Sequence, residues 1–154
     1  MSRYNECGCD LNRKVNKSTQ KGIVLQRTII DSFNPDIIVT LHEAPQANFL
    51  IHSNKLLEDE LLFQILNDTE NNGIVLSTED YFGKKLKVAG NSKIKGGLKF
   101  LKKLVQVQAL GGDYLAKKGI VEITTESGWN SQDTFQRVNS HVFVISSLVD
   151  NYKK

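Results

Sequence analysis

The chain has 154 residues, of which 40% are hydrophobic and 24% are charged, and its formal net charge is +3. These values are typical of a globular domain with one core, and so mild a charge gives no argument for a nucleic-acid partner. No apolar run reaches membrane-spanning length, and the polar amino-terminal residues contain no visible secretory signal. We therefore expect a single domain over residues 1–154, with the cytoplasm as the default compartment and no membrane partner.

The two cysteines, Cys7 and Cys9, are separated by one residue, which excludes a disulfide framework. A Cys-x-Cys pair can bind a metal, but two thiols do not complete a closed site. We interpret the pair as incidental to the structure.

Helical and strand-like patterns alternate along the chain. The sequence predicts helices at about 19–33, 56–67, 113–118 and 132–152, strands at 36–41, 74–78, 104–109 and 120–125, and loops at 1–17 and 43–54. Asn34-Pro35 ends the first helix, because the residue before a proline disfavours helical backbone. This order predicts an α/β fold with three αβα layers, in which helices cover a largely parallel or mixed central sheet.

The last predicted helix is amphipathic. Its apolar residues fall three or four positions apart on one face: Phe135, Val138, Val142, Ile145 and Val149. Such spacing is typical of a helix that packs one apolar face against neighbouring structure.

Two predicted strands each deliver a titratable side chain at their carboxyl end, His42 after residues 36–41 and Glu126 after residues 120–125. In open α/β sheets, ligands bind outside the carboxyl ends of the strands, so the two groups are candidates for one crevice. A neutral imidazole binds zinc well, and a carboxylate can act as general base. The residues alone leave alternatives open: a hydrogen-bonded histidine at a strand end, and a capping or salt-bridging glutamate.

Two further segments have alternative interpretations. Asn12 and Arg13 place an amide beside a guanidinium, a pair that can grip a carboxylate, although an exposed loop explains them equally. Eight lysines between positions 84 and 103 form a basic stretch without a nucleic-acid motif, which we interpret as a solvated face. Trp129 follows Glu126 and can either line a pocket or pack.

Taken in order, these segments resemble the zinc metallocarboxypeptidase family. Residues 3–13 (RYNECGCDLNR) are similar to its R-x-N-x-x-G-x-D-L-N-R segment, residues 35–43 (PDIIVTLHE) to its third metal-ligand segment, and residues 120–128 (IVEITTESG) to its catalytic-glutamate strand. The closing helix, with its QRV at 136–138 and His141, also resembles the family's last helix. The match is comparable for the deacylase branch of succinylglutamate desuccinylase and aspartoacylase type.

The resemblance implies a role for each candidate residue. His42 would be one zinc ligand, and Glu126 would take a proton from the attacking water and pass it to the leaving amine. Asn12 and Arg13 would hold the carboxylate of a small peptide or N-acyl amino acid. Arg3 would stabilise the developing oxyanion, because a guanidinium there meets charge that forms only in the transition state. The implied reaction is zinc-dependent hydrolysis of an amide next to a carboxylate.

The chain departs from the family's pattern in its metal ligands. The family's other two ligands come from a His-x-x-Glu motif upstream of the Asn-Arg pair, and none of the chain's histidines (His42, His52, His141) rebuilds it. The family's pocket tyrosine has no clear match, the nearest being Tyr114. We therefore expect the carboxyl-terminal, N-terminally truncated part of such a catalytic domain, inactive alone and with uncovered apolar surface. The alternative is a non-catalytic carboxylate-binding module or an inactive truncated relative of the family.

Overall fold

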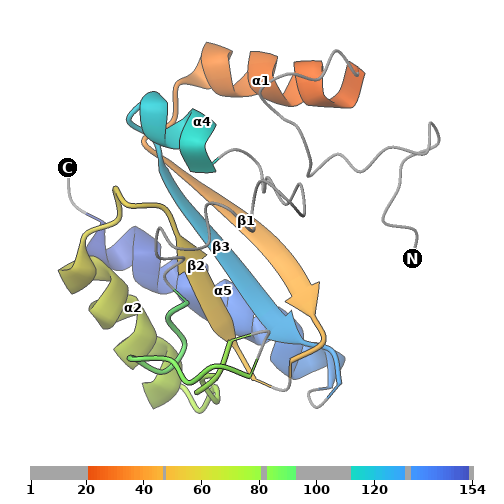
Figure 1. Cartoon of the computed structure of the whole chain (residues 1–154), viewed down its shortest axis with the longest axis vertical. Helices are drawn as coiled ribbons and strands as arrows, with labels where there is room; N and C mark the ends of the chain where they lie inside the picture. Colours follow the sequence, from red (N-terminus) through yellow and green to blue (C-terminus); the bar gives the residue numbers. More distant parts are fainter. Residues whose placement is uncertain (1–20, 47, 81–82, 93–111, 131–132, 153–154) are drawn as a thin grey trace.

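The computed structural model describes residues 21–46, 48–80, 83–92, 112–130 and 133–152. Within them, helices and a three-stranded mixed sheet form an α/β fold, as the sequence predicts. The strands lie in the order β1-β3-β2, so that β3 is central (Figure 1). None of the helices in this part of the chain has both the length and the apolar character of a membrane span.

The central pair of strands runs parallel. β1 (Ile37–Ala44) pairs with β3 (Val121–Gly128) over eight consecutive Cα partners, from Ile37 with Val121 to Ala44 with Gly128. Both strands are longer than predicted and continue past the candidate site residues. His42 and Glu126 therefore lie inside paired strands and not after their ends.

The third strand was not predicted. β2 (Leu50–Ser53) lies within the expected loop 43–54 and runs antiparallel to β3. Leu50 and Ile51 are fully buried, and Leu50 is the Cα partner of Glu126. Burial of these two side chains stabilises the strand. With four residues, β2 is too short for its sequence pattern to be recognised as a strand.

One face of the sheet is covered by α5 (Thr134–Asn151), which α2 (Asp59–Asn71) flanks. Figure 1 shows α5 crossing behind the strands. The core on this face joins Val121 and Ile123 of β3 to the buried side chains of both helices. α5 begins at the Asp133 cap, whose carboxylate accepts a hydrogen bond from Gln136 N at 2.8 Å.

The opposite face is covered at one end by α1 (Lys21–Phe33) and α4 (Gly112–Lys117). Ile30 of α1 and Leu115 of α4 form a second buried cluster with Ile120, against which Ile38 packs. Ile38 alternates with the β1 residues that pack against the α5 core, which puts the two clusters on opposite faces of the sheet. Helices therefore lie on both faces, at the amino-terminal end of β3 on this one.

Three predicted elements differ from the structure or lie outside its described residues. The helix predicted at 56–67 begins at Asp59 and continues to Asn71. Residues 74–78 form no strand, although Leu76 makes an isolated bridge to Phe49. The strand predicted at 104–109 lies outside the described residues. α1 ends as expected before Pro35, where Asn34 adopts a left-handed φ of 42°.

The predicted packing face of α5 is wrong. The helix turns Ser140, Val144, Ser147 and Leu148 towards the interior, while its apolar stripe faces outwards. The two serines can be buried because each is satisfied: Ser140 Oγ donates to Gln136 O at 2.8 Å, and Ser147 Oγ donates to Asp68 of α2. Small side chains also let α5 approach its neighbours closely.

Candidate functional site

His42 and Glu126 are direct Cα partners on neighbouring parallel strands. Residues paired in this way project their side chains from the same face of a sheet. Thr125, which comes one position before Glu126, hydrogen-bonds to His141 of α5. Because side chains alternate along a strand, Glu126 and His42 project from the face opposite α5. The structure thus brings these two predicted site residues together.

A second histidine contacts the glutamate. His52 of β2 places Nε2 3.2 Å from Glu126 Oε2, and its Nδ1 lies 3.1 Å from the backbone oxygen of Ser92. The side chains of His52 and Glu126 are 15% and 12% exposed. Sequence analysis missed His52, because 74 residues separate it from Glu126 and the strand that carries it was not predicted.

The hydrogen bonds that His52 makes to Ser92 and Glu126 indicate where its hydrogens lie. A carbonyl oxygen can only accept, so His52 Nδ1 carries a hydrogen and donates it to Ser92. One further proton must then lie between Nε2 and Glu126 Oε2, either on the imidazole or on the carboxyl group. This contact engages Oε2 of Glu126.

His42 has the environment of an available ligand. Its side chain is half-buried, on the face of the sheet that it shares with Glu126. A three-ligand catalytic metal site needs more than this imidazole. Across residues 21–46, 48–80, 83–92, 112–130 and 133–152, no group of three or more metal-binding side chains lies together. These residues alone do not fit a complete zinc site.

The remaining predicted residues do not join the pair in the described structure. Arg3, Asn12 and Arg13 lie outside the described residues, as do Cys7 and Cys9. Tyr114, the nearest match to a pocket tyrosine, belongs to α4 at the other end of β3. Its hydroxyl donates to Asp31 Oδ1 of α1 at 2.8 Å, which gives it a role in joining these two helices.

His141 occupies the α5 side of the same strand. Its Nδ1 lies 2.7 Å from Thr125 Oγ1 and its Nε2 lies 3.1 Å from Ser127 Oγ. Burial lowers the pKa of His141 below its usual value of 6.5; the charge of Glu43 opposes this effect, and that of His42 adds to it. A neutral imidazole that contacts two hydroxyl groups of β3 holds α5 against this face of the sheet, which gives His141 a role in packing.

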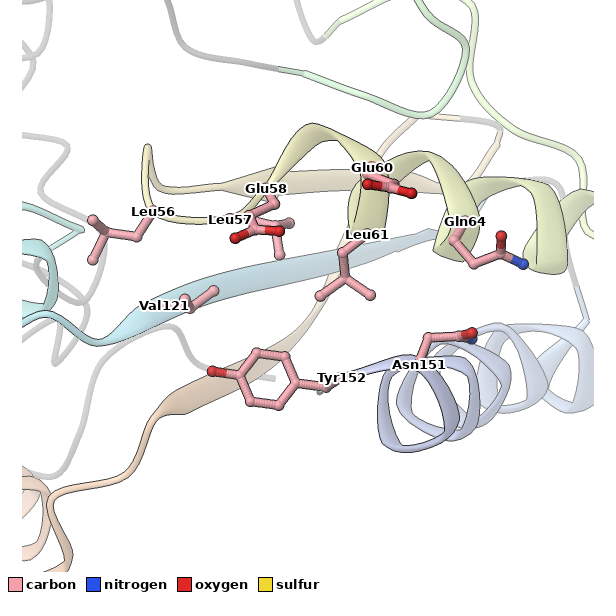
Figure 2. A pocket seen from close by; sticks show the side chains of 9 residues that line it. All are labelled: Leu56, Leu57, Glu58, Glu60, Leu61, Gln64, Val121, Asn151 and Tyr152. Carbon is pink, nitrogen blue, oxygen red and sulfur yellow. The ribbon is translucent and has the colours of Figure 1, made fainter. Parts of the chain in front are cut away.

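Two cavities of similar size lie in different parts of the fold. The first, of ≈ 390 Å³, opens between the start of α2 and the end of α5 (Figure 2). It is lined by Leu56, Leu57, Glu58, Glu60, Leu61, Gln64, Val121, Asn151 and Tyr152. Val121 precedes Glu126 by five positions on β3, about 16 Å along an extended strand. This cavity is therefore remote from the candidate site.

The second cavity, of ≈ 410 Å³, lies beyond the carboxyl end of β1, where ligands of α/β sheets bind. Its lining is polar and partly acidic: Pro45, Gln46, Asn48, Ser77, Thr78, Glu79, Asp80 and Gly83. The oxygen and nitrogen of the Gln46 amide are both buried and have no hydrogen-bond partner among the described residues. Buried polar atoms of this kind are rare, and a polar ligand would satisfy them.

Known proteins resemble the chain in fold. No protein-family model and no curated protein matches it. Two crystal structures do, both of proteins described as a "putative metallopeptidase". The protein from Shewanella denitrificans superposes with a TM-score of 0.69 at 12% sequence identity, and that from Shewanella amazonensis with a TM-score of 0.67 at 13% identity.

The similarity extends over nearly all of this chain. It covers 95% and 96% of the present residues but 53% and 56% of the two solved chains, so the chain spans about half of their length. The chain shares the fold of part of these two structures. At such low identity the similarity establishes the fold and leaves activity to be argued from the site.

Proposed function

We propose that the chain carries part of the active site of a metal-dependent hydrolase that cleaves an amide bond. The observation that carries the proposal is the pairing of His42 with Glu126 on one face of two parallel strands. The fold shared with two proteins described as metallopeptidases supports it. Such a reaction needs a group that binds a metal and a group that moves a proton. An imidazole and a carboxylate on neighbouring strands can supply these two groups.

Glu126 transfers the proton in this proposal. Its Oε1 takes a proton from the attacking water and delivers it to the nitrogen of the leaving amine as the amide bond breaks. His52 holds Oε2 at 3.2 Å, which fixes the orientation of the carboxylate throughout. The backbone oxygen of Ser92 holds His52 in place, so His52 is a rigid partner for Glu126. The carboxylate can then present its other oxygen to the substrate.

His42 would be one ligand of the metal, and the chain's resemblance in sequence implies that the metal is zinc. Since the described residues do not complete a site, further ligands would have to come from outside them. When bound, zinc would polarise the scissile carbonyl and favour ionisation of the attacking water. Arg3 would stabilise the oxyanion, in line with its place in the sequence motif.

The substrate class follows from the basic motif and the second cavity. Asn12 and Arg13 would bind the carboxylate of a short peptide or an N-acyl amino acid. Glu79 and Asp80 line the cavity beyond β1 and would repel a carboxylate there. The part of the substrate remote from its carboxylate therefore fits this cavity, where a substrate amide can pair with Gln46.

A hydrolysis assay tests the proposal. Because the described residues lack a full ligand set, the chain is extended at its amino terminus by a segment that carries the family's His-x-x-Glu ligands, supplied with zinc and incubated with short peptides and N-acyl amino acids, and the released amine is quantified. The expected result is turnover that Glu126→Gln lowers by at least about a hundredfold. Glu60→Gln, at the remote first cavity, is the matched control and should keep the wild-type rate. Full activity of Glu126→Gln would defeat the role of this residue.

A non-catalytic carboxylate-binding module is the second candidate. The observation in its favour is that the described residues contain no group of three metal-binding side chains. Such a module would bind N-acyl amino acids without turnover, and its affinity would be the same with zinc and with a chelator. Zinc-dependent release of amine in the assay above would exclude it.

A further inference from the structure

The outer face of α5 carries a continuous apolar seam. Its five members are Phe135, Val138, Val142, Ile145 and Val149, and they are 37% to 74% exposed. They are separated by alternating steps of three and four residues, which is the a/d pattern of a helix that pairs with another helix. The buried residue Val144 lies on the side of α5 roughly opposite the seam, so the seam faces outwards from the sheet.

We propose that this seam joins two copies of the chain through α5–α5 packing. The steps of three and four make the seam complementary to itself, as a two-fold interface requires. The residues beside it at the e positions, Asn139 and Ser146, are uncharged, so two copies meet without like-charge repulsion. α5 carries only two charged residues, Arg137 and Asp150, and neither lies at a seam position.

The exposed area is sufficient for such a contact. From the exposed fractions, the seam presents about 500 Å² of apolar surface in each copy, or about 1,000 Å² from two copies, which is near the lower bound of a specific interface. A patch of this size is as large as the largest apolar patch on a typical monomer, and such patches are often functional. A polypeptide that extended the sheet would add strands in its plane beside β1 or β2, one layer away from the outer face of α5.

Sedimentation velocity of the full chain tests the proposal, from micromolar to millimolar concentration. The wild type should sediment as a dimer at the higher concentrations. Val142→Glu should weaken dimerisation by at least about tenfold, because it buries two like charges at the centre of the seam. Val142→Ile should keep the dimer. Val75→Glu, at an equally exposed valine outside α5, should also keep it.

Circular dichroism of each variant separates loss of association from loss of fold, since Val142 is 51% exposed and its replacement leaves the core intact. A monomeric wild type across the whole range would overturn the proposal, as would an unchanged dimer of Val142→Glu. A third contrary outcome concerns the variant Val142→Cys. If this variant is monomeric and a thiol reagent fails to label the cysteine at position 142, as judged by mass spectrometry, the proposal is also overturned. That result would show that another part of the same chain covers the seam.

Discussion

The imidazole of His52 lies 3.2 Å from the carboxylate of Glu126 and is held from behind by the backbone oxygen of Ser92. The three groups come from separate parts of the chain and meet on the face of the sheet opposite α5. The side chains of His52 and Glu126 are nearly buried, so water could replace little of the hydrogen bonding that each provides to the other. The relationship makes His52 a positioning residue for Glu126 and gives the first prediction.

Replacing His52 by alanine should destabilise the fold. Glu126 would lose its hydrogen bond to His52 while its side chain remains 12% exposed, and a poorly solvated carboxylate without a partner costs about 1–3 kcal/mol. Urea unfolding at neutral pH measures the change in the free energy of unfolding. His42→Ala, on the neighbouring strand, is the matched control and should change this free energy by less than about 0.5 kcal/mol, because its side chain is only half-buried. Equal losses in the two variants would contradict the pairing.

The environment of His141 predicts that stability falls at mildly acidic pH. Burial lowers its pKa in the folded state, so below pH 6.5 the unfolded chain binds a proton more readily than the folded chain. The contribution of this residue is complete above pH 6.5 and is lost as the pH falls towards the lower folded-state pKa. The free energy of unfolding should therefore be smaller at pH 5.5 than at pH 7.5.

His141→Gln tests that assignment by comparison. An amide does not titrate in this range and can still bond to Thr125 or Ser127, so the difference between the two pH values should shrink. Other groups titrate as well, and for this reason the prediction concerns the change between wild type and variant. A pH dependence identical in both proteins would show that His141 is not responsible.

Gly90 should tolerate no side chain. Its φ is +74°, and an added Cβ would lie 2.8 Å from Leu66 Cδ2 and 3.0 Å from Leu76 Cδ2, both in the core. Gly90→Ala should lower the free energy of unfolding by about 2–4 kcal/mol, through backbone strain and a core clash together. Gly73 has a similar φ of +78° but open space around it, so Gly73→Ala should cost only about 1 kcal/mol. Equal costs would show that the core yields freely at Gly90.

The parts of the fold that sequence predicts are those with a strong local pattern. The apolar runs of β1 and β3 identify both strands, and their shared register brings His42 and Glu126 together. The turn at Asn34-Pro35 ends α1 at the predicted place, because its cause is local. The parallel pairing of β1 with β3 also depends on the rule for crossover connections between parallel strands. This rule concerns the path of the chain and applies without knowledge of any side-chain contact.

The parts that sequence does not predict depend on tertiary contacts. His52 belongs to a four-residue strand whose only cue is a short apolar run, and its partner lies 74 positions away. The packing face of α5 combines two small residues, Ser140 and Ser147, with Val144 and Leu148, and it leaves out the longer apolar stripe. Periodicity identifies an apolar face but not which surface covers it. For α5, the apolar face is the one that remains exposed.

A double-mutant cycle between His42 and Glu126 tests the central claim most directly. Zinc-dependent amide hydrolysis is measured in the extended polypeptide that supplies the further metal ligands, for the unmodified sequence, His42→Ala, Glu126→Gln and the double variant. If both residues serve one reaction site, each single change removes most of the activity, and the double variant should be no slower than the slower single variant within about threefold. Losses that multiply, or a His42→Ala variant as active as wild type, would contradict a shared site.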